Sequence, residues 1–182
     1  MKYCSECSVK VELIIPDGDT LPRYVCPSCK IVHYQNPKVV VGCIPEWEDK
    51  ILLCKRAIEP RIGWWTLPAG FMENKETIAQ GAARETLEEA NANVEIGALY
   101  AVYSLPYISQ VYILFRAQLL DLEFSPGIES QEVKLFSENE IPWNEIAFRV
   151  IYDPLKVYFE ERAKGNLGYD VGIIEGPNRS PQ

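Results

Sequence analysis

Two Cys-x2-Cys pairs near the N-terminus constrain this chain more than any other feature of its sequence. Cys4–Cys7 and Cys26–Cys29 are separated by 18 residues (8–25), and the intervening VELII, PDGD and LPRYV predict two short strands joined by a tight turn. Four thiolates presented by two facing turns suit a tetrahedral zinc site that is closed and therefore structural. The alternative is two pairs of buried or redox-active thiols, but both spacings fit zinc at once. We predict a four-cysteine zinc ribbon over residues 1–33, which is too small to hold a stable core without metal.

The acidic composition narrows the classes of partner. The chain of 182 residues has 26 Asp and Glu against 18 Lys and Arg, so its net charge is −8. This charge argues against bare nucleic acid as a partner. No stretch approaches the roughly 20 apolar residues of a membrane span, and MKYCSEC at the start has no apolar signal region. We therefore expect a cytoplasmic protein with no membrane partner, whose cysteines are thiols or metal ligands rather than disulfides.

The rest of the chain contains strand-like and helix-like segments. We expect strands at 38–47, 50–56, 99–106, 110–119 and 132–136, a short strand within 63–70, a helix from Thr77 to Ala90 and helical structure over about 144–164. These elements define a larger domain of residues 37–165. The segment 166–182 is rich in Gly, Pro and polar residues, and we expect it to be a tail or a lone edge strand.

Three glutamates crowd one side of the predicted helix. Glu85, Glu88 and Glu89 stand at i, i+3 and i+4, so they project within an arc of about 100°. Three carboxylates at this range repel one another, and hard divalent cations with oxygen ligands would offset the repulsion. Mg²⁺ fits where substrate phosphates complete its octahedron. The alternative is a solvated charged face with an Arg84–Glu88 pair, and these residues alone leave both interpretations open.

The surroundings of the glutamates resemble a known family signature. Gly70, five residues, Glu76, seven residues and then RETLEEAN follow the pattern G-x5-E-x7-R-E-U-x-E-E-x-G-U of the Nudix hydrolases, in which U is aliphatic. GWWTLPAG (63–70) also resembles the family's usual run into this box. Thr86 occupies an aliphatic position, and Asn91 replaces the final glycine. Because Asn is the next-best residue for a left-handed helix end, we expect the cap to survive.

The resemblance implies a fold, an activity and roles for matched residues. The implied fold is α+β, the Nudix α/β/α sandwich, and the implied activity is metal-dependent hydrolysis of a nucleoside diphosphate derivative. The three glutamates would bind Mg²⁺ or Mn²⁺, with the carbonyl of Gly70 nearby. Arg84 and Glu76 would hold the loop and the helix in register. A further acidic residue would act as general base, and Glu129 and Glu132 are the candidates.

The resemblance extends beyond the box and bears on the substrate. The cysteine module followed by HYQNPKVVVGC, ILLCKR, WTLPAGFME, SPGIES and LFSENEIP is similar to a zinc-ribbon Nudix subgroup that includes FAD diphosphatases. The NADH-diphosphatase subgroup also carries four cysteines, but its S-Q-P-W-P-F-P-x-S run is replaced here by VYSLPYISQVY. FAD, cleaved to FMN and AMP, is therefore the favoured substrate, with ADP-ribose and NADH as alternatives.

Several side chains are candidates for contact with such a substrate. The aromatic residues could stack on a flat ring and the basic ones could meet phosphate: Trp64, Trp65, Tyr103, Tyr107, Tyr112, Lys55, Arg56 and Arg61. For each aromatic residue the ordinary alternative is core packing, and for each basic residue it is a surface charge. The single histidine, His33, follows a complete cysteine set, so we expect a surface or interface residue.

Two other function classes remain for the whole chain. One is an RNA 5′-end hydrolase, since zinc ribbons often meet nucleic acid, although the chain lacks a Lys/Arg stripe. The other is a non-catalytic nucleotide sensor, but such proteins usually lose box glutamates and this chain keeps them. The sequence also leaves open whether the protein forms a homodimer.

Overall fold

The computed structural model describes residues 1–176, and the chain forms two compact units. The first is Met1–Pro37 and the second runs from Lys38 onward. Residues 177–182 of the segment predicted as a tail lie outside the described residues.

The first unit is a small three-stranded antiparallel sheet of β1 (Glu12–Ile14), β2 (Arg23–Val25) and β3 (Val32–His33), in that order. The turn between β1 and β2 lies where PDGD predicts it, with Gly18 at a φ of 83°. The buried side chains of this unit are Cys4, Val11 and Cys26. So small a core cannot hold the unit together alone, which gives the cysteine cluster a structural task.

The second unit is built on an eight-stranded mixed sheet. Its main path runs β10-β5-β4-β9-β8-β11. The strands on this path are β4 (Lys38–Trp47), β5 (Lys50–Arg56), β8 (Val94–Leu105), β9 (Gln110–Leu119), β10 (Ser130–Phe136) and β11 (Asp170–Ile173). β4 pairs with β9 and β8 with β11 in parallel, and the other pairs are antiparallel.

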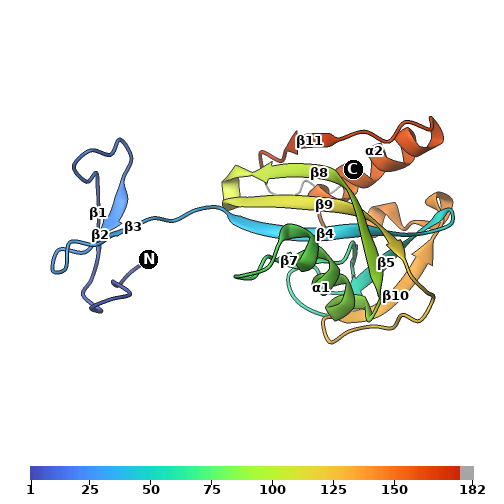
Figure 1. The fold of residues 1–182 in the computed structure, drawn as a ribbon, viewed down its shortest axis with the longest axis horizontal. Helices are drawn as coiled ribbons and strands as arrows, with labels where there is room; N and C mark the ends of the chain where they lie inside the picture. The colour runs from blue at the N-terminus through green and yellow to red at the C-terminus, as the bar shows by residue number, and fades with distance from the viewer. Residues whose placement is uncertain (177–182) are drawn as a thin grey trace. The chain divides into compact units, whose positions relative to one another are not determined.

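One helix packs on each face of this sheet (Figure 1). α1 (Ile78–Ala90) places Ala82 against Val41 and Cys43 of β4, whereas α2 (Arg149–Ala163) packs on the face that carries Ile44. Successive side chains of β4 point to opposite faces of the sheet, so this strand contributes to the hydrophobic cores on both faces. This arrangement confirms the predicted α+β fold and the α/β/α sandwich.

The sheet is split beside its centre. β4 and β5 pair only next to their connecting turn, through Glu46–Ile51 and Trp47–Lys50. Further along, β5 pairs instead with the short β6 (Trp65–Thr66), and β4 pairs with β7 (Ala69–Phe71). The segment 65–71, which contains β6 and β7, therefore lies between the two long strands where they diverge.

Most predicted elements lie where expected, with differences at their ends. β8 starts at Val94 rather than 99, because register shifts between Ile96 and Ala101 let an irregular strand continue the pairing with β9. The helical structure expected from 144 is a separate turn followed by α2. The short 3-10 helices are η1 (Pro106–Ile108), η2 (Glu138–Glu140) and η3 (Trp143–Glu145). Residues 170–173 form an edge strand, one of the two alternatives stated for this segment.

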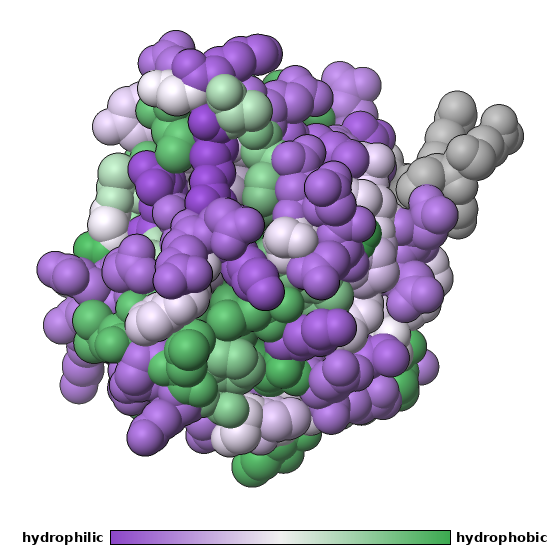
Figure 2. Space-filling model, turned by 90° about the vertical axis from the view of Figure 1, so that its right-hand side faces the viewer, coloured by the Kyte–Doolittle hydropathy of each residue, from purple (hydrophilic) through white to green (hydrophobic). Residues whose placement is uncertain are grey.

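The surface is largely polar in the view of Figure 2, where hydrophobic residues form one larger area below the centre and smaller ones elsewhere. Across the described residues, no helix has both the length and the apolar character needed to cross a membrane.

Candidate active site

The helix α1 carries the three glutamates and is closed at both ends. Thr77 accepts a hydrogen bond from the Gln80 backbone N–H, and the Gln80 side chain accepts one from the Thr77 N–H, which completes a capping box. At the other end Asn91 is left-handed, with a φ of 47°, and its N–H donates to the Leu87 carbonyl over 2.8 Å. The expectation that Asn91 preserves the cap is confirmed.

Arg84 joins the loop before the helix to the helix itself. Its Nε and Nη2 donate to the two carboxylate oxygens of Glu76 over 3.0 and 2.8 Å, and Nη2 also donates to the Phe71 carbonyl over 3.1 Å. Glu76 in turn accepts from the Glu73 N–H over 2.7 Å. The Arg84 hydrogen bonds lower the pKa of Glu76 to about 2. These contacts fix the loop so that β7 and α1 keep one relative position.

The three glutamates differ in their surroundings. Glu85 and Glu89 are buried, whereas the side chain of Glu88 is 58% exposed. Arg84 Nη1 donates to Glu85 over 2.7 Å and to Glu88 over 2.9 Å. The Arg84–Glu88 pair of the alternative interpretation is therefore present. Burial of Glu85 and Glu89, however, does not match a helix face that is simply solvated.

Burial also changes how these carboxyls ionise. Loss of water raises the pKa of Glu89 to about 8, and the charge of Glu85 adds to this effect. Burial raises the pKa of Glu85 as well, although the Arg84 hydrogen bond opposes it. A buried carboxyl beside a second one is a costly arrangement for a protein without a compensating cation, and it is typical of functional sites.

The β7 backbone lies against the same two carboxylates. The Ala69 N–H is 3.4 Å from Glu89 Oε2, and a Cβ built on Gly70 would collide with the Glu85 carboxylate. Any side chain at position 70 would therefore have to displace the Glu85 carboxylate. The donor set of three carboxylates beside a backbone strand consists of hard oxygens and fits Mg²⁺ or Mn²⁺.

The segment SPGIES (125–130) is fastened to the end of α1. The N–H groups of Ser125 and Gly127 donate to the carbonyls of Ala90 and Glu89 over 2.9 and 3.0 Å. Asn91 Nδ2 donates to the Ser125 and Pro126 carbonyls, each over 3.2 Å. A Cβ on Gly127 would collide with the backbone carbonyl of Glu88. The loop thus satisfies the free carbonyls of the helix end and cannot move independently of the glutamates.

A cavity of about 1280 Å³ connects the glutamates to an apolar compartment. One end is lined by charged groups, including Glu73, Arg84, Glu85, Glu88, Glu89 and Glu129. The other end is lined mainly by apolar and aromatic side chains: Val40, Leu105, Tyr107, Ile108, Tyr112, Phe148, Val150, Ile151 and Ile174. Charged groups that converge beside an apolar compartment are the usual form of a site for a small-molecule ligand.

The two candidates for the general base lie in different places. Glu129 is exposed, lines the cavity, and its charge contributes to the raised pKa values of Glu85 and Glu89. Glu132 is not among the lining residues. It lies on β10 opposite Lys55 of β5, so the structure does not bring it to the three glutamates of α1.

Only some of the candidate substrate-contact residues line the cavity. Arg56, Arg61, Tyr107 and Tyr112 line the cavity, whereas Lys55, Trp64, Trp65 and Tyr103 are not among its lining residues. Trp65 is buried in the core, edge-on to Phe136 with ring centroids 4.8 Å apart, and Lys55 lies over its ring. Core packing, the ordinary alternative, therefore accounts for Trp65.

Arg56 is held in place by the loop that follows its strand. Its Nε donates to the Pro60 carbonyl over 2.8 Å, and its guanidinium lies 5.2 Å from the ring centroid of Phe148. Phe148 was not among the sequence candidates, and neither were Ile128, which is 98% exposed, nor Ile174. Nothing in their local sequence marks these residues, since only the fold brings three distant segments to one cavity.

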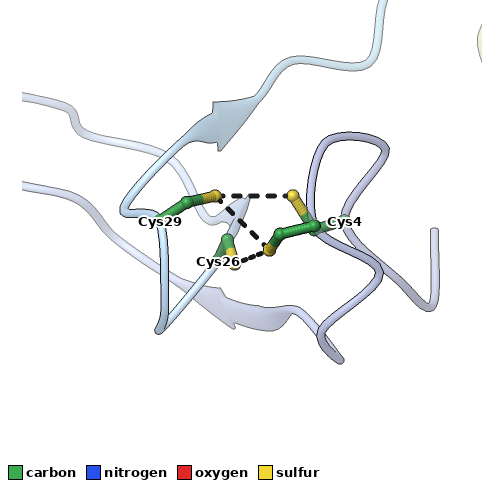
Figure 3. Close-up of side chains that lie close together, drawn as sticks. Cys4, Cys26 and Cys29 are labelled. Atoms are coloured by element: carbon green, nitrogen blue, oxygen red, sulfur yellow. Dashed lines mark hydrogen bonds between the residues drawn. The ribbon is translucent and has the colours of Figure 1, made fainter.

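The four cysteines of the first unit come together as predicted. Their sulfur atoms all lie within 4.8 Å of one another, and three pairs are 3.4, 3.6 and 3.7 Å apart (Figure 3). Sulfurs bound at about 2.3 Å around a tetrahedral zinc would be separated by about 3.8 Å. The geometry therefore fits a structural Zn²⁺ held by the four thiolates.

His33 is placed differently from its expected position. It is half-buried, and its Nε2 is 3.3 Å from the Cys4 sulfur, so it contacts the cluster instead of standing free at the surface. Because β3 pairs with β2, the residue after the second cysteine turn is brought back beside the first. A donor at this position would stabilise a zinc-bound thiolate.

The comparisons with known proteins agree with this fold and site. The protein-family model of the NUDIX domain matches residues 36–154. The family model of the zinc ribbon, described as Nudix N-terminal, matches residues 2–35. The chain belongs to the Nudix hydrolase family. A crystal structure of a NUDIX hydrolase from Nitrosomonas europaea is 72% identical, with a TM-score of 0.94 over 97% of this chain and 100% of that chain.

Curated relatives are more distant. An ADP-ribose pyrophosphatase of Methanocaldococcus jannaschii is 35% identical over 60% of this chain and 67% of that protein. The NAD-capped RNA hydrolase NudC of Photobacterium profundum is 28% identical over 70% of this chain and 46% of its own length. The chain therefore spans about half to two thirds of these two relatives.

Proposed function

We propose that this chain hydrolyses the diphosphate bond of a nucleoside diphosphate derivative, with FAD, cleaved to FMN and AMP, as the favoured substrate. The observation that carries the proposal is a cavity that is lined both by Glu85, Glu88 and Glu89 and by a compartment of apolar and aromatic side chains. A diphosphate held by cations at the acidic end would leave a ring system within reach of the other end. No polyanion would enter this acidic end without such cations.

Each charged residue at the acidic end has a definite task under this proposal. Glu85, Glu88 and Glu89 would hold Mg²⁺ or Mn²⁺, which when bound neutralises the diphosphate and activates water. Arg84 keeps Glu85 and Glu88 oriented and ties α1 to the preceding loop. Glu129 would accept the proton of the attacking water, since it lines the cavity and Glu132 does not.

The N-terminal unit has a structural role in this proposal. Residues 1–33 would form a zinc ribbon whose four thiolates close the coordination shell, and residues 37–165 would form the hydrolase domain. We assign no catalytic step to the ribbon.

The choice of substrate rests on the sequence as well as on the cavity. The stretches SPGIES and LFSENEIP resemble the FAD-cleaving subgroup, and the run typical of NADH diphosphatases is missing. ADP-ribose is the first alternative, because the relative from Methanocaldococcus jannaschii is an ADP-ribose pyrophosphatase. Hydrolysis at RNA 5′ ends is the second, because several relatives are NAD-capped RNA hydrolases.

A substrate panel tests the proposal. FAD, NADH, ADP-ribose and an NAD-capped RNA oligonucleotide are incubated with Mg²⁺ or Mn²⁺, and the products are separated by chromatography. We expect FMN and AMP from FAD, no turnover without divalent cation, and no turnover in Glu89→Gln. A kcat/KM for FAD tenfold or more below that of another substrate, about 1.4 kcal/mol of transition-state preference, would discard FAD. Binding without hydrolysis of any compound would favour the sensor alternative.

A further inference from the structure

We propose that the edge strand β11 is a substrate-selecting element, and that Ile174, directly after it, forms the wall that receives the ring of the substrate that is not adenine. This inference rests on the proposed function and deepens it. The ligand class is a flat and mainly apolar ring system joined to the diphosphate by a sugar or polyol spacer. The segment involved lies outside the residues 36–154 that the NUDIX domain model matches.

β11 is held on the sheet by specific contacts. It pairs in parallel with β8, the Ile174 N–H donates to the Ser104 carbonyl over 3.0 Å, and the Tyr103 hydroxyl donates to Asp170 Oδ2 over 2.7 Å. Gly172 faces the Tyr103 ring so closely that a Cβ there would collide with it. These contacts give β11, and Ile174 directly after it, a defined position on the sheet.

Side chains alternate strictly along β11. Val171 and Ile173 are 76% and 63% exposed, whereas Ile174 is only 2% exposed. Ile174 lines the cavity together with Leu105 of β8 and Ile151 of α2. Val171 is an exposed aliphatic residue three positions before the buried Ile174, so it offers a matched control.

The distance from the glutamates decides which part of a substrate can reach Ile174. Between β4, which borders β7 and the acidic end, and β11 lie the strands β9 and β8. Three spacings of about 4.8 Å place β11 about 14 Å from β4 along the sheet. A sugar phosphate alone would stay at the acidic end. A ring carried by a spacer would reach the far wall of the compartment at Ile174, as the ribityl-linked ring of a flavin does.

The chemistry of the compartment selects against adenine at this end. Its polar lining groups are the Gln110 side chain, the hydroxyls of Tyr107 and Tyr112 and, beside Phe148, the Arg56 guanidinium, and its other lining side chains are aliphatic or phenylalanine. Adenine needs hydrogen-bonding partners for its nitrogens, and burying them unpaired is costly. A ring with an apolar edge loses fewer hydrogen bonds to water than adenine does when it enters the compartment. We therefore assign the compartment to the non-adenine half of the substrate.

The test compares Ile174→Ala with Val171→Ala in the full-length chain. Steady-state kcat and KM are measured with Mg²⁺ for FAD and for ADP-ribose, which has no second ring. We expect Ile174→Ala to raise KM for FAD about tenfold with kcat changed less than twofold, because binding common to ground and transition states is lost. KM for ADP-ribose should change less than twofold, and Val171→Ala should match the wild type for both substrates.

Other outcomes overturn the inference. An equal rise in KM for FAD and ADP-ribose would place adenine in the compartment. A fall in thermal stability with unchanged KM would leave β11 a merely structural strand. If Ile174→Ala does not fold, Ile174→Val replaces it, with about a threefold rise in KM for FAD expected, and an unchanged KM would reject the inference.

Failure of the proposed function can be told apart from failure of this inference. If the wild type hydrolyses none of the substrates, the function is wrong. The compartment is then tested by titrating FMN and AMP separately into metal-free protein, following flavin fluorescence and heat. About tenfold weaker FMN binding in Ile174→Ala, with AMP binding unchanged, would uphold the selecting role of β11. Equal FMN binding in both proteins would reject it.

Discussion

The substitution Glu89→Gln should stabilise the metal-free protein at high pH while it abolishes activity. Glu89 is buried, and among the described contacts the only hydrogen bond of its carboxylate is the long one from the Ala69 N–H. A glutamine keeps the shape of the side chain and an acceptor oxygen for that N–H, but it never becomes charged. The variant therefore removes the cost of a buried carboxylate.

The raised pKa of Glu89 sets both the size and the pH dependence of the effect. Folding moves it from the ordinary 4.5 to about 8. Below pH 4.5 the carboxyl is neutral in both states, so it does not affect stability. Between pH 4.5 and 8 only the unfolded chain ionises, and stability falls as pH rises, by about 5 kcal/mol once pH exceeds 8. Glu89→Gln should gain up to about 4 kcal/mol at pH 8 and about 1 kcal/mol at pH 5.

Tryptophan fluorescence can follow this unfolding in the relevant unit alone. All four tryptophans, Trp47, Trp64, Trp65 and Trp143, lie after Pro37. In EDTA the midpoint of Glu89→Gln should exceed that of the wild type by about 10 °C at pH 8, at about 3 °C per kcal/mol. Mg²⁺ should raise the midpoint of the wild type more than that of the variant.

The exposed neighbour Glu88 provides the control. Glu88→Gln removes the pair with Arg84, so it should cost less than about 1 kcal/mol, and the loss should not grow with pH. A Glu89→Gln variant that is no more stable than the wild type at pH 8, or whose gain does not change between pH 5 and 8, would refute the reasoning.

Three further outcomes follow from the geometry. Gly127→Ala should destabilise the larger unit by about 1–3 kcal/mol in denaturant titrations, because the new methyl group collides with a helix carbonyl; a neutral effect would contradict the fixed loop. Asn91→Ala should cost about 1 kcal/mol and Asn91→Gly clearly less, since glycine keeps the left-handed cap; equal losses would assign the effect to the side-chain hydrogen bonds. His33→Ala should speed zinc release to a chromogenic chelator severalfold, with Tyr34→Ala as a neighbouring control, because the Cys4 thiolate loses a donor; unchanged release would show that His33 does not contact a bound thiolate.

The parts of the fold that the sequence could predict are those with local causes. Each Cys-x2-Cys pair is local, and the repeat of the same spacing predicts the cluster. The i, i+3, i+4 glutamates with Asn91 predict α1 and its cap, because they lie within a few turns of one helix. The predicted starts of α2 and β8 differ from the observed ones. A 3-10 turn precedes α2, and strand irregularities extend β8, and neither leaves a periodic signal.

The apolar half of the cavity could not be predicted for a different reason. Phe148, Ile151 and Ile174 look like ordinary core residues in the sequence, and each is separated from the glutamates by dozens of residues. Their shared position depends on the parallel pairing of β11 with β8 and on the placement of α2. The position of Trp65 illustrates the converse, since an aromatic residue near the box turns out to pack on Phe136.

The parallel pairings have a consequence for the speed of folding. Lys38 pairs with Gln110 and Asp170 with Ala101, so both joints bring together residues that are far apart along the chain. The chain loses loop-closure entropy before these long-range contacts form and offset the loss. Sheets with such contacts therefore fold slowly, in milliseconds to seconds. β4 lies at the middle of the sheet, so its amide hydrogens should exchange only through global unfolding. β11 pairs along one side only, so its amides should exchange through local opening at lower free energy. Hydrogen-exchange mass spectrometry should therefore find β11 opening many times for each unfolding that exposes the amides of β4.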